Sequence, residues 1–447
     1  MAKTKNIDMT KGPILKELVL FALPLLLGNA FQQLYNTVDS VIVGQFVGPE
    51  SLAAVTSTAV IINTLVGLFV GFSTGSSVII SQFFGAKKED MLQKSIHTAL
   101  SATFIMGIVF MILGYFITPP LITLMKTDVS VIEPATTYLR IYFLGIMGLM
   151  FYNMTSAVLR AVGDSVRPLI FLIVTSLLNI ILDLLFVIKF EMGVAGVAYA
   201  TIISQFVSAL MGILVLSHTS ENYGISFAKM HIDKGILAKI FAVGLPAGLQ
   251  MAVISFSNIF VQSYINSFGA ASTAGWGCYG RIDAFVILPL QSISLANTTF
   301  TGQNAGSKNP DRIKKGIRVS LLLAIVVTLI ICTAEYIEAP AIIKLFTKDE
   351  AVMKYGTIFI RCNCMFDFLC CFNQIHAGVL RGIGDATAPM FIMIFSFVLF
   401  RQLYLFIITK FIHSIYPISL SFPMGWMMCS VLMLIYFKLS HWEKKVL

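Results

Sequence analysis

Charged residues are scarce in this chain. They make up 12% of its 447 residues, whereas hydrophobic residues make up 57% and the mean hydropathy is +0.86. A typical soluble domain carries about 25% charged residues. So few charges cannot cover the water-facing surface of a soluble protein of this length. The composition therefore predicts a membrane protein.

The sequence also lacks the motifs of enzymes and metal centres. Its seven cysteines fall within or beside hydrophobic stretches, without the spacing of zinc ligands. No nucleophile–base set and no phosphate-binding loop is visible. We therefore expect neither an enzyme nor a bound cofactor, and we interpret the cysteines as small buried hydrophobic side chains.

Long uncharged runs are present instead, for example at 19–38, 98–117 and 192–217. Each is close to the roughly 20 apolar residues that a helix needs to cross a bilayer. The predicted fold is thus an all-α membrane protein with twelve transmembrane helices. The predicted spans are 15–47, 51–82, 94–118, 134–160, 166–188, 193–217, 236–267, 272–301, 316–337, 351–380, 388–411 and 417–438.

Two motifs occur once in each half of the chain. The first is Leu159, Arg160, Gly163 and Asp164, which return as Leu380, Arg381, Gly384 and Asp385. The second is Gln82, Gly85, Lys87 and Asp90, which return as Gln303, Gly306, Lys308 and Asp311. A duplicated bundle of membrane helices is typical of a transporter.

The duplication defines the predicted domains: an N-terminal six-helix lobe (1–220), a polar cytoplasmic linker (221–235) and a C-terminal six-helix lobe (236–447). An even number of spans separates equivalent helices, so the two six-helix repeats are parallel. A proline lies inside the first span of each repeat, at Pro24 and Pro246. Each proline is either a fixed kink or a hinge.

The net charge of +9 reflects topology. Most of the 31 Lys and Arg residues fall at the termini and in the loops after even-numbered spans, including Lys3, Lys5, Lys87 and Lys308. By the positive-inside rule, we expect a multi-pass protein of the cell membrane with both termini cytoplasmic. We expect no nucleic-acid partner.

Two carboxylates lie within predicted spans of the first repeat. Asp39 is late in the first span and Asp183 is deep in the fifth, where Asn179 lies one turn before it. A charge at the bilayer centre costs roughly 2.5–3.5 kcal/mol on insertion scales, and such residues mark ion or substrate paths. Thr201 of the next span is a candidate oxygen ligand. These oxygens suit a hard cation such as Na⁺, and two adjacent carboxylates could instead share a proton.

The duplication provides an internal comparison for this polar set. The second-repeat positions that correspond to Asp39, Asn179, Asp183 and Thr201 hold Phe260, Phe400, Tyr404 and Phe422. The fold therefore does not require these polar groups, which favours a cation site over a structural network. The second repeat has its own charged residues within the spans, namely Arg281, Asp283, Asp367 and Arg401. They could pair with one another or with substrate, and we interpret them as a buried ion-pair network.

Taken in order, these features resemble the multidrug and toxic compound extrusion (MATE) family. The early proline, the Gln-x-x-Tyr before Asp39, the Leu-Arg-x-x-Gly-Asp segments and the Asn-x-x-x-Asp of the fifth span carry the resemblance. It is closer to the prokaryotic branch with a cation site in the amino-terminal lobe.

The resemblance implies site residues and a function. The cation site would be Asp39, Asn179, Asp183 and Thr201, the supporting network Tyr138 and Asn153, the substrate cavity Gln32 and Tyr35, and the hinge Pro24. The expected function is antiport, in which Na⁺ or H⁺ entry drives export of small amphipathic, often cationic, compounds by a monomer. The alternatives are a flippase for a lipid-linked precursor and a passive channel.

Overall fold

The computed structural model describes residues 6–124 and 129–446, and it contains no β-strand within them. Lys3 and Lys5 lie outside the described residues. The α-helices of the first half are α1 (Ile14–Ile42), α2 (Pro49–Gly85), α3 (Glu89–Leu124), α4 (Val129–Ala161), α5 (Val166–Leu184) and α6 (Gly193–His218). Those of the second half are α7 (Lys234–Asn266), α8 (Ala270–Gly306), α9 (Pro310–Lys344), α10 (Glu350–Cys364), α11 (Asp367–Gly382), α12 (Thr387–Ile394), α13 (Arg401–Phe411), α14 (Ile415–Ser419) and α15 (Ser421–Leu439).

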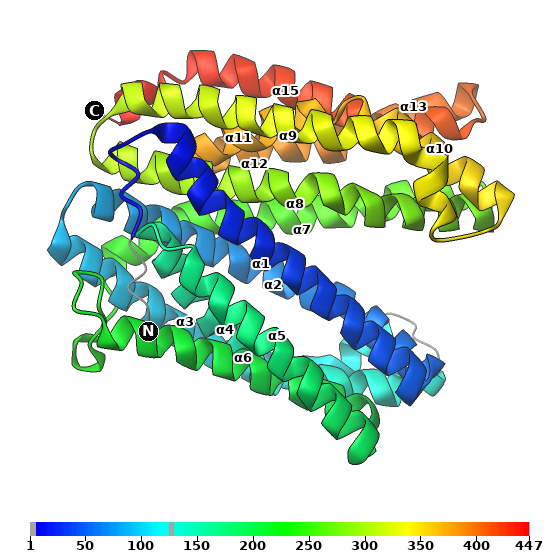
Figure 1. The fold of residues 1–447 in the computed structure, drawn as a ribbon, viewed down its shortest axis with the longest axis horizontal. Helices are drawn as coiled ribbons and strands as arrows, with labels where there is room; N and C mark the ends of the chain where they lie inside the picture. Colours follow the sequence, from blue (N-terminus) through cyan, green and yellow to red (C-terminus); the bar gives the residue numbers. More distant parts are fainter. Residues whose placement is uncertain (1–5, 125–128, 447) are drawn as a thin grey trace. The chain divides into compact units, whose positions relative to one another are not determined.

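Shorter elements complete the chain. Three π-helical turns, η1 (Val43–Val47), η2 (Leu185–Lys189) and η4 (Phe395–Phe400), extend or join long helices. Two 3₁₀ turns, η3 (Phe227–Lys229) and η5 (Trp442–Lys445), lie in the central connection and near the C-terminus. Figure 1 shows α1 as one continuous helix and α5 and α6 as long neighbours, which contact each other.

The helices match the predicted spans. In the described part of the chain, ten helical segments are long and apolar enough to cross a membrane, and the pair α10–α11 forms an eleventh with a bend of 51°. The 37-residue α8 occupies the remaining predicted span, and its polar residues lower its hydropathy. The all-α membrane architecture is confirmed. The tenth span differs from its prediction because it breaks between Cys364 and Asp367 instead of running straight.

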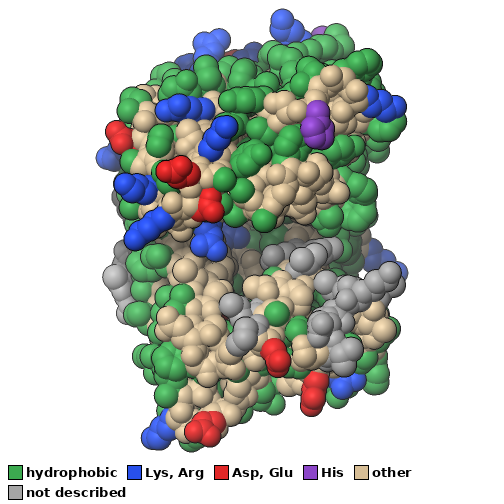
Figure 2. All heavy atoms as spheres, turned by 90° about the vertical axis from the view of Figure 1, so that its right-hand side faces the viewer, with side chains coloured by type: hydrophobic (Ala, Val, Ile, Leu, Met, Phe, Trp, Pro, Cys, Tyr) green, Lys and Arg blue, Asp and Glu red, His purple; other side chains and the backbone are tan. Residues whose placement is uncertain are grey.

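The outer surface of the helices is largely apolar. Large hydrophobic side chains are exposed on most of the long helices, among them Phe116, Leu322 and Phe391. Figure 2 shows hydrophobic side chains over much of one face, with charged side chains scattered among them. Water would disfavour so much exposed apolar area, whereas lipid chains accommodate it.

The described residues form two compact units that do not follow the sequence halves strictly. One unit contains residues up to Asp8 and Leu23–Gly244, and the other contains Met9–Ala22 and Leu245 onward. The start of α1 thus belongs to the second unit and the start of α7 to the first. The lobes 1–220 and 236–447, with the linker 221–235, therefore differ from these units at both places.

Both repeated motifs form the same turn in each unit. Gly163 and Gly384 have φ values of 91° and 94°, the left-handed conformation that ends a helix. Asp164 then accepts hydrogen bonds from the backbone N–H groups of Val166 and Arg167, at 3.1 and 3.0 Å, and so caps α5. In the other motif, Lys87 and Lys308 share a φ of 55°. These segments act as scaffold in both repeats.

Asp385 makes a further contact, with the C-terminal segment. Its carboxylate accepts hydrogen bonds from Lys445 Nζ and Tyr436 Oη, each at 2.6 Å. Burial opposes ionisation, but these bonds outweigh it and hold the pKa of Asp385 below its usual value of 3.8. The stabilisation that these hydrogen bonds provide is complete above pH 3.8. It is lost as the pH falls through the lower pKa that Asp385 has in the folded protein.

We expect Asp385→Asn to lower the free energy of unfolding by about 1 kcal/mol at neutral pH. The difference should shrink as the pH is lowered below about 4, because Asp385 then becomes protonated in the wild type. Thermal unfolding followed by circular dichroism over this pH range measures the difference in stability between the variant and the wild type. Glu443→Gln is the matched control, since the Lys314–Glu443 pair is 43% and 47% exposed. Equal effects of the two substitutions would contradict the prediction.

Candidate cation and substrate site

A small cavity lies within the first unit, between α1, α4, α5 and α6. Its volume is about 40 Å³, which is room for a few waters or an ion and far below the roughly 300 Å³ of a drug-sized site. Its lining residues are Gln32, Tyr35, Leu149, Tyr152, Leu172, Thr175, Ser176, Asn179, Thr201, Ser204, Gln205 and Ser208. None of them is charged.

The structure brings most of the predicted site residues together. Gln32, Tyr35, Asn179 and Thr201 line this cavity from three different helices. Asp39 lies one turn beyond Tyr35 on α1, and Asp183 lies one turn beyond Asn179 on α5. The carboxyl groups of the two aspartates lie close enough to influence each other. Two carboxyl groups from separate helices are therefore neighbours at one end of a polar cavity.

These polar groups are buried without enough partners. The Asp183 side chain is fully buried and Asn179 is 2% exposed. Within residues 6–124 and 129–446, both carboxyl oxygens of Asp183, both polar side-chain atoms of Asn179 and one oxygen of Asp39 have no hydrogen-bond partner. Each such atom costs about 1–3 kcal/mol. A bound cation or a shared proton would supply the missing partner, so the donor set fits either ion.

Thr201 and Tyr138 complete one side of this arrangement. The Thr201 hydroxyl donates to the Val197 carbonyl at 2.9 Å, which leaves its oxygen lone pairs available as a ligand. Tyr138 on α4 lies within electrostatic range of both aspartates, and its ring stacks on Tyr142 with centroids 6.3 Å apart.

Asn153 and Pro24 lie elsewhere. The Asn153 amide donates to the Leu149 carbonyl one turn earlier, and the residue is not part of the cavity lining. Pro24 lies inside α1 before the cavity residues, and the helix continues through it. The roles predicted for these two residues stay predictions.

Two π turns adjoin the carboxyl pair. η1 begins four residues after Asp39, η2 begins two residues after Asp183, and the two turns contact each other. Val43 and Val187, one from each turn, are buried in a common apolar cluster with Tyr138. π turns are frequent at functional sites because they insert a residue into the helical repeat. Here they bring the ends of α1 and α5 together beyond the aspartates.

Several lining residues were not predicted. Tyr152, Thr175 and Ser176 contribute from α4 and α5, and Ser204, Gln205 and Ser208 extend the cavity along α6. The α6 residues follow Thr201 at intervals that keep them on one helical face. A polar stripe in an otherwise apolar span was the signal that could have identified them.

The ion-pair network predicted in the second repeat is wrong. Arg281 is exposed, and Arg401 donates to Ser257 and Asn258 at 3.0 and 2.7 Å. Asp283 instead accepts a hydrogen bond from the Tyr279 hydroxyl at 3.1 Å. In the described residues no ion pair links these arginines to a carboxylate.

Asp367 is likewise bonded to a neutral group, since its carboxylate accepts from Cys332 at 3.4 Å. It lies within electrostatic range of Asp283 and Glu335. The second unit thus holds a group of buried acids in place of an ion-pair network.

Known proteins similar to this chain agree with the fold and the duplication. The MatE family model matches twice, at residues 24–185 and 246–407. The chain is 30% identical to the probable multidrug resistance protein YpnP of Bacillus subtilis, over 98% of each chain. It is 26% identical to the probable multidrug resistance protein NorM of Thermotoga maritima, over 97% of this chain and 94% of that protein.

Solved structures are similar over almost the whole chain. An outward-facing multidrug resistance MATE family transporter of the MOP superfamily superposes with a TM-score of 0.92 at 24% identity, over 99% of this chain and 100% of that one. A second similar structure is a MOP superfamily transporter from Pyrococcus furiosus, for which a reverse polarity of the binding pocket suggests a different function. Its TM-score is 0.91 at 24% sequence identity, over 99% of both chains.

These structures share the fold. The family match covers both repeats and most of the chain, and members of this family are membrane transporters, not enzymes. This chain therefore belongs to the MatE family.

Proposed function

We propose that this protein is an antiporter that exports small amphipathic, often cationic, molecules in exchange for an entering Na⁺ or H⁺. The observation that carries the proposal is the pair of carboxyl groups of Asp39 and Asp183, which two helices bring close together and which are short of hydrogen-bond partners. The names of the relatives, which describe multidrug resistance, support the substrate class.

Exchange follows if cation and substrate favour different conformations of the protein. Cation entry neutralises the carboxyl pair and supplies the ligand that Asp183 and Asn179 lack. The small cavity suits the cation-bound state, because about 40 Å³ cannot hold a drug-sized molecule. A substrate-bound state must then widen this region, and the cation must oppose that widening. Each ligand lowers the affinity for the other.

The proposal includes the setting of the transporter. We infer that both termini lie in the cytoplasm, because the basic loops lie on the side of the termini. We also propose that the protein works as a monomer in the cell membrane. A flippase for anionic lipid-linked precursors would need a basic cavity. The described lining has no Lys or Arg, so it gives that alternative no support.

Efflux from proteoliposomes tests the proposal. We expect ethidium loaded into the vesicles to be released when an inward gradient of Na⁺ or of H⁺ is imposed, and each gradient is applied separately to identify the ion. Protein-free vesicles are the control. Ethidium flux that is indifferent to both gradients would indicate a passive channel and overturn antiport.

A further inference from the structure

The first helix of each repeat is divided between the two units. The division in α1 falls between Ala22 and Leu23, one residue before Pro24. The division in α7 falls between Gly244 and Leu245, one residue before Pro246. In both helices the segment before the proline packs in one unit and the rest packs in the other. Prolines are the positions where a helix bends most readily.

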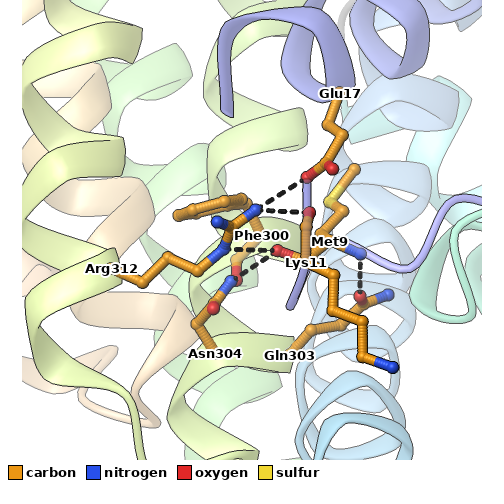
Figure 3. Close-up of polar contacts among 7 residues, drawn as sticks. All are labelled: Met9, Lys11, Glu17, Phe300, Gln303, Asn304 and Arg312. Carbon is orange, nitrogen blue, oxygen red and sulfur yellow. Dashed lines mark hydrogen bonds and ion pairs between the residues drawn. The ribbon is translucent and has the colours of Figure 1, made fainter. Parts of the chain in front are cut away.

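The first part of α1 is held in the second unit by a group of polar contacts (Figure 3). Met9 is fully buried, and its N–H donates to Gln303 Oε1 at 3.0 Å. The Met9 carbonyl accepts from Asn304 Nδ2 at 3.0 Å and from Arg312 Nε at 3.1 Å. A segment so close to the terminus is ordinarily mobile unless it is tied down in this way.

Arg312 is the centre of this group. Its guanidinium also donates to the Lys11 carbonyl at 2.6 Å and to Glu17 Oε2 at 2.9 Å, and it lies 5.5 Å from the centre of the Phe300 ring. The Arg312 and Glu17 side chains are only 15% and 11% exposed. One planar side chain therefore ties the segment before α1 and the first turn of α1 to α8 and α9.

The start of α7 is held in the first unit in a different way. The Asp233 N–H donates to Thr98 Oγ1 at 3.0 Å, and the backbone near Gly244 approaches that of Gly75 closely. The position in the first repeat that corresponds to Arg312 is Met91, which cannot donate in this way. The arginine anchor thus serves only α1, the helix that carries Asp39.

We propose that Arg312 anchors the first part of α1 to α8 and α9 of the second unit, and that this fixed start allows a bend at Pro24, the hinge that the family resemblance implies, to displace Asp39. Glu17 and Asp39 are separated by 22 residues, or about 33 Å of helix. A rigid helix with one bend can transmit a displacement over that distance. Arg312 is a positioning residue in this proposal, which rests on the proposed antiport for its effect on transport.

Arg312→Gln tests the anchor in the full-length protein. Hydrogen exchange should become at least about tenfold faster at the amides of residues 14–22 and stay unchanged at 25–42. Ethidium turnover in proteoliposomes should fall about tenfold, while the ethidium Kd stays within about twofold of the wild-type value. A fall in turnover without a change in Kd identifies a loss of coupling, because a misfolded site would weaken ethidium binding as well.

Two further variants calibrate the result. Lys315→Gln removes the same charge at an exposed position three residues along α9 and should change neither readout. Glu17→Gln keeps the bonds from Arg312 to the Met9 and Lys11 carbonyls and should give an intermediate effect, so the proposal remains testable if Arg312→Gln does not fold.

The proposal is overturned if exchange at residues 14–22 does not change in either the Arg312 or the Glu17 variant. It is also overturned if exchange accelerates while turnover stays at the wild-type level. If the wild type itself shows no gradient-driven ethidium release, antiport fails separately, and the exchange measurements still decide whether Arg312 anchors α1.

Discussion

Replacing Asp39 with asparagine should reduce gradient-driven export on the order of 100-fold or more while leaving the protein at least as stable as the wild type. Asparagine preserves the size of the side chain but cannot neutralise an entering cation or carry a transferable proton. Stability should not fall, because Asp39 and Asp183 are two acidic groups held close together, and Asp183 is fully buried, where an ionised group is costly.

The paired arrangement adds a second expectation. Asp183→Asn should be as damaging as Asp39→Asn, and the double variant should be no worse than either, because the two groups act as a unit. Ethidium efflux under the gradient identified for the wild type measures transport, and circular dichroism melting measures stability. If Asp39→Asn exports normally and Asp283→Asn does not, the coupling ion binds in the second unit instead.

Gly75→Ala should destabilise the protein, whereas Gly277→Ala should stabilise it. Both glycines are helical, and alanine favours a helix by about 1 kcal/mol over glycine. A Cβ atom at Gly277 would meet nothing within 4 Å, so that gain should appear in full. A Cβ atom at Gly75 would lie 2.6 Å from Gly244 N and 2.8 Å from its Cα.

Backbone atoms cannot move aside as a flexible side chain can, so the start of α7 would have to shift. Overpacking of this kind costs typically 1–3 kcal/mol, which exceeds the gain in helix propensity. Melting of the two purified variants by circular dichroism at 222 nm should therefore shift in opposite directions from the wild type. Shifts of the same sign would show that α7 is not packed tightly on α2.

The sequence was sufficient to predict the helices because lipid imposes a simple requirement on them. An apolar run of the right length leaves few alternatives to a helix that spans the membrane. The bend between Cys364 and Asp367 could not be predicted in this way, since neither proline nor glycine occurs at the break. Only the tertiary structure shows it.

The candidate site was predictable in part for a related reason. A carboxylate is so unfavourable in an apolar span that Asp39 and Asp183 are conspicuous in the sequence. A serine costs far less free energy in a membrane helix than a carboxylate does, so Ser204 and Ser208 were not conspicuous in the sequence. The ion-pair network interpreted for the second repeat failed because Arg281 is exposed and Arg401 donates to the neutral side chains of Ser257 and Asn258 instead.

The shared first helices also bear on how such a chain could have arisen. Two identical six-helix subunits that exchange the first segment of their first helix would form a domain-swapped homodimer. Joining the two genes would give a single polypeptide in which the first segment of each half still packs in the other unit, as the starts of α1 and α7 do here. A fragment that ends at residue 220 would keep Met9–Ala22 but lose the residues of α8 and α9 against which that segment packs.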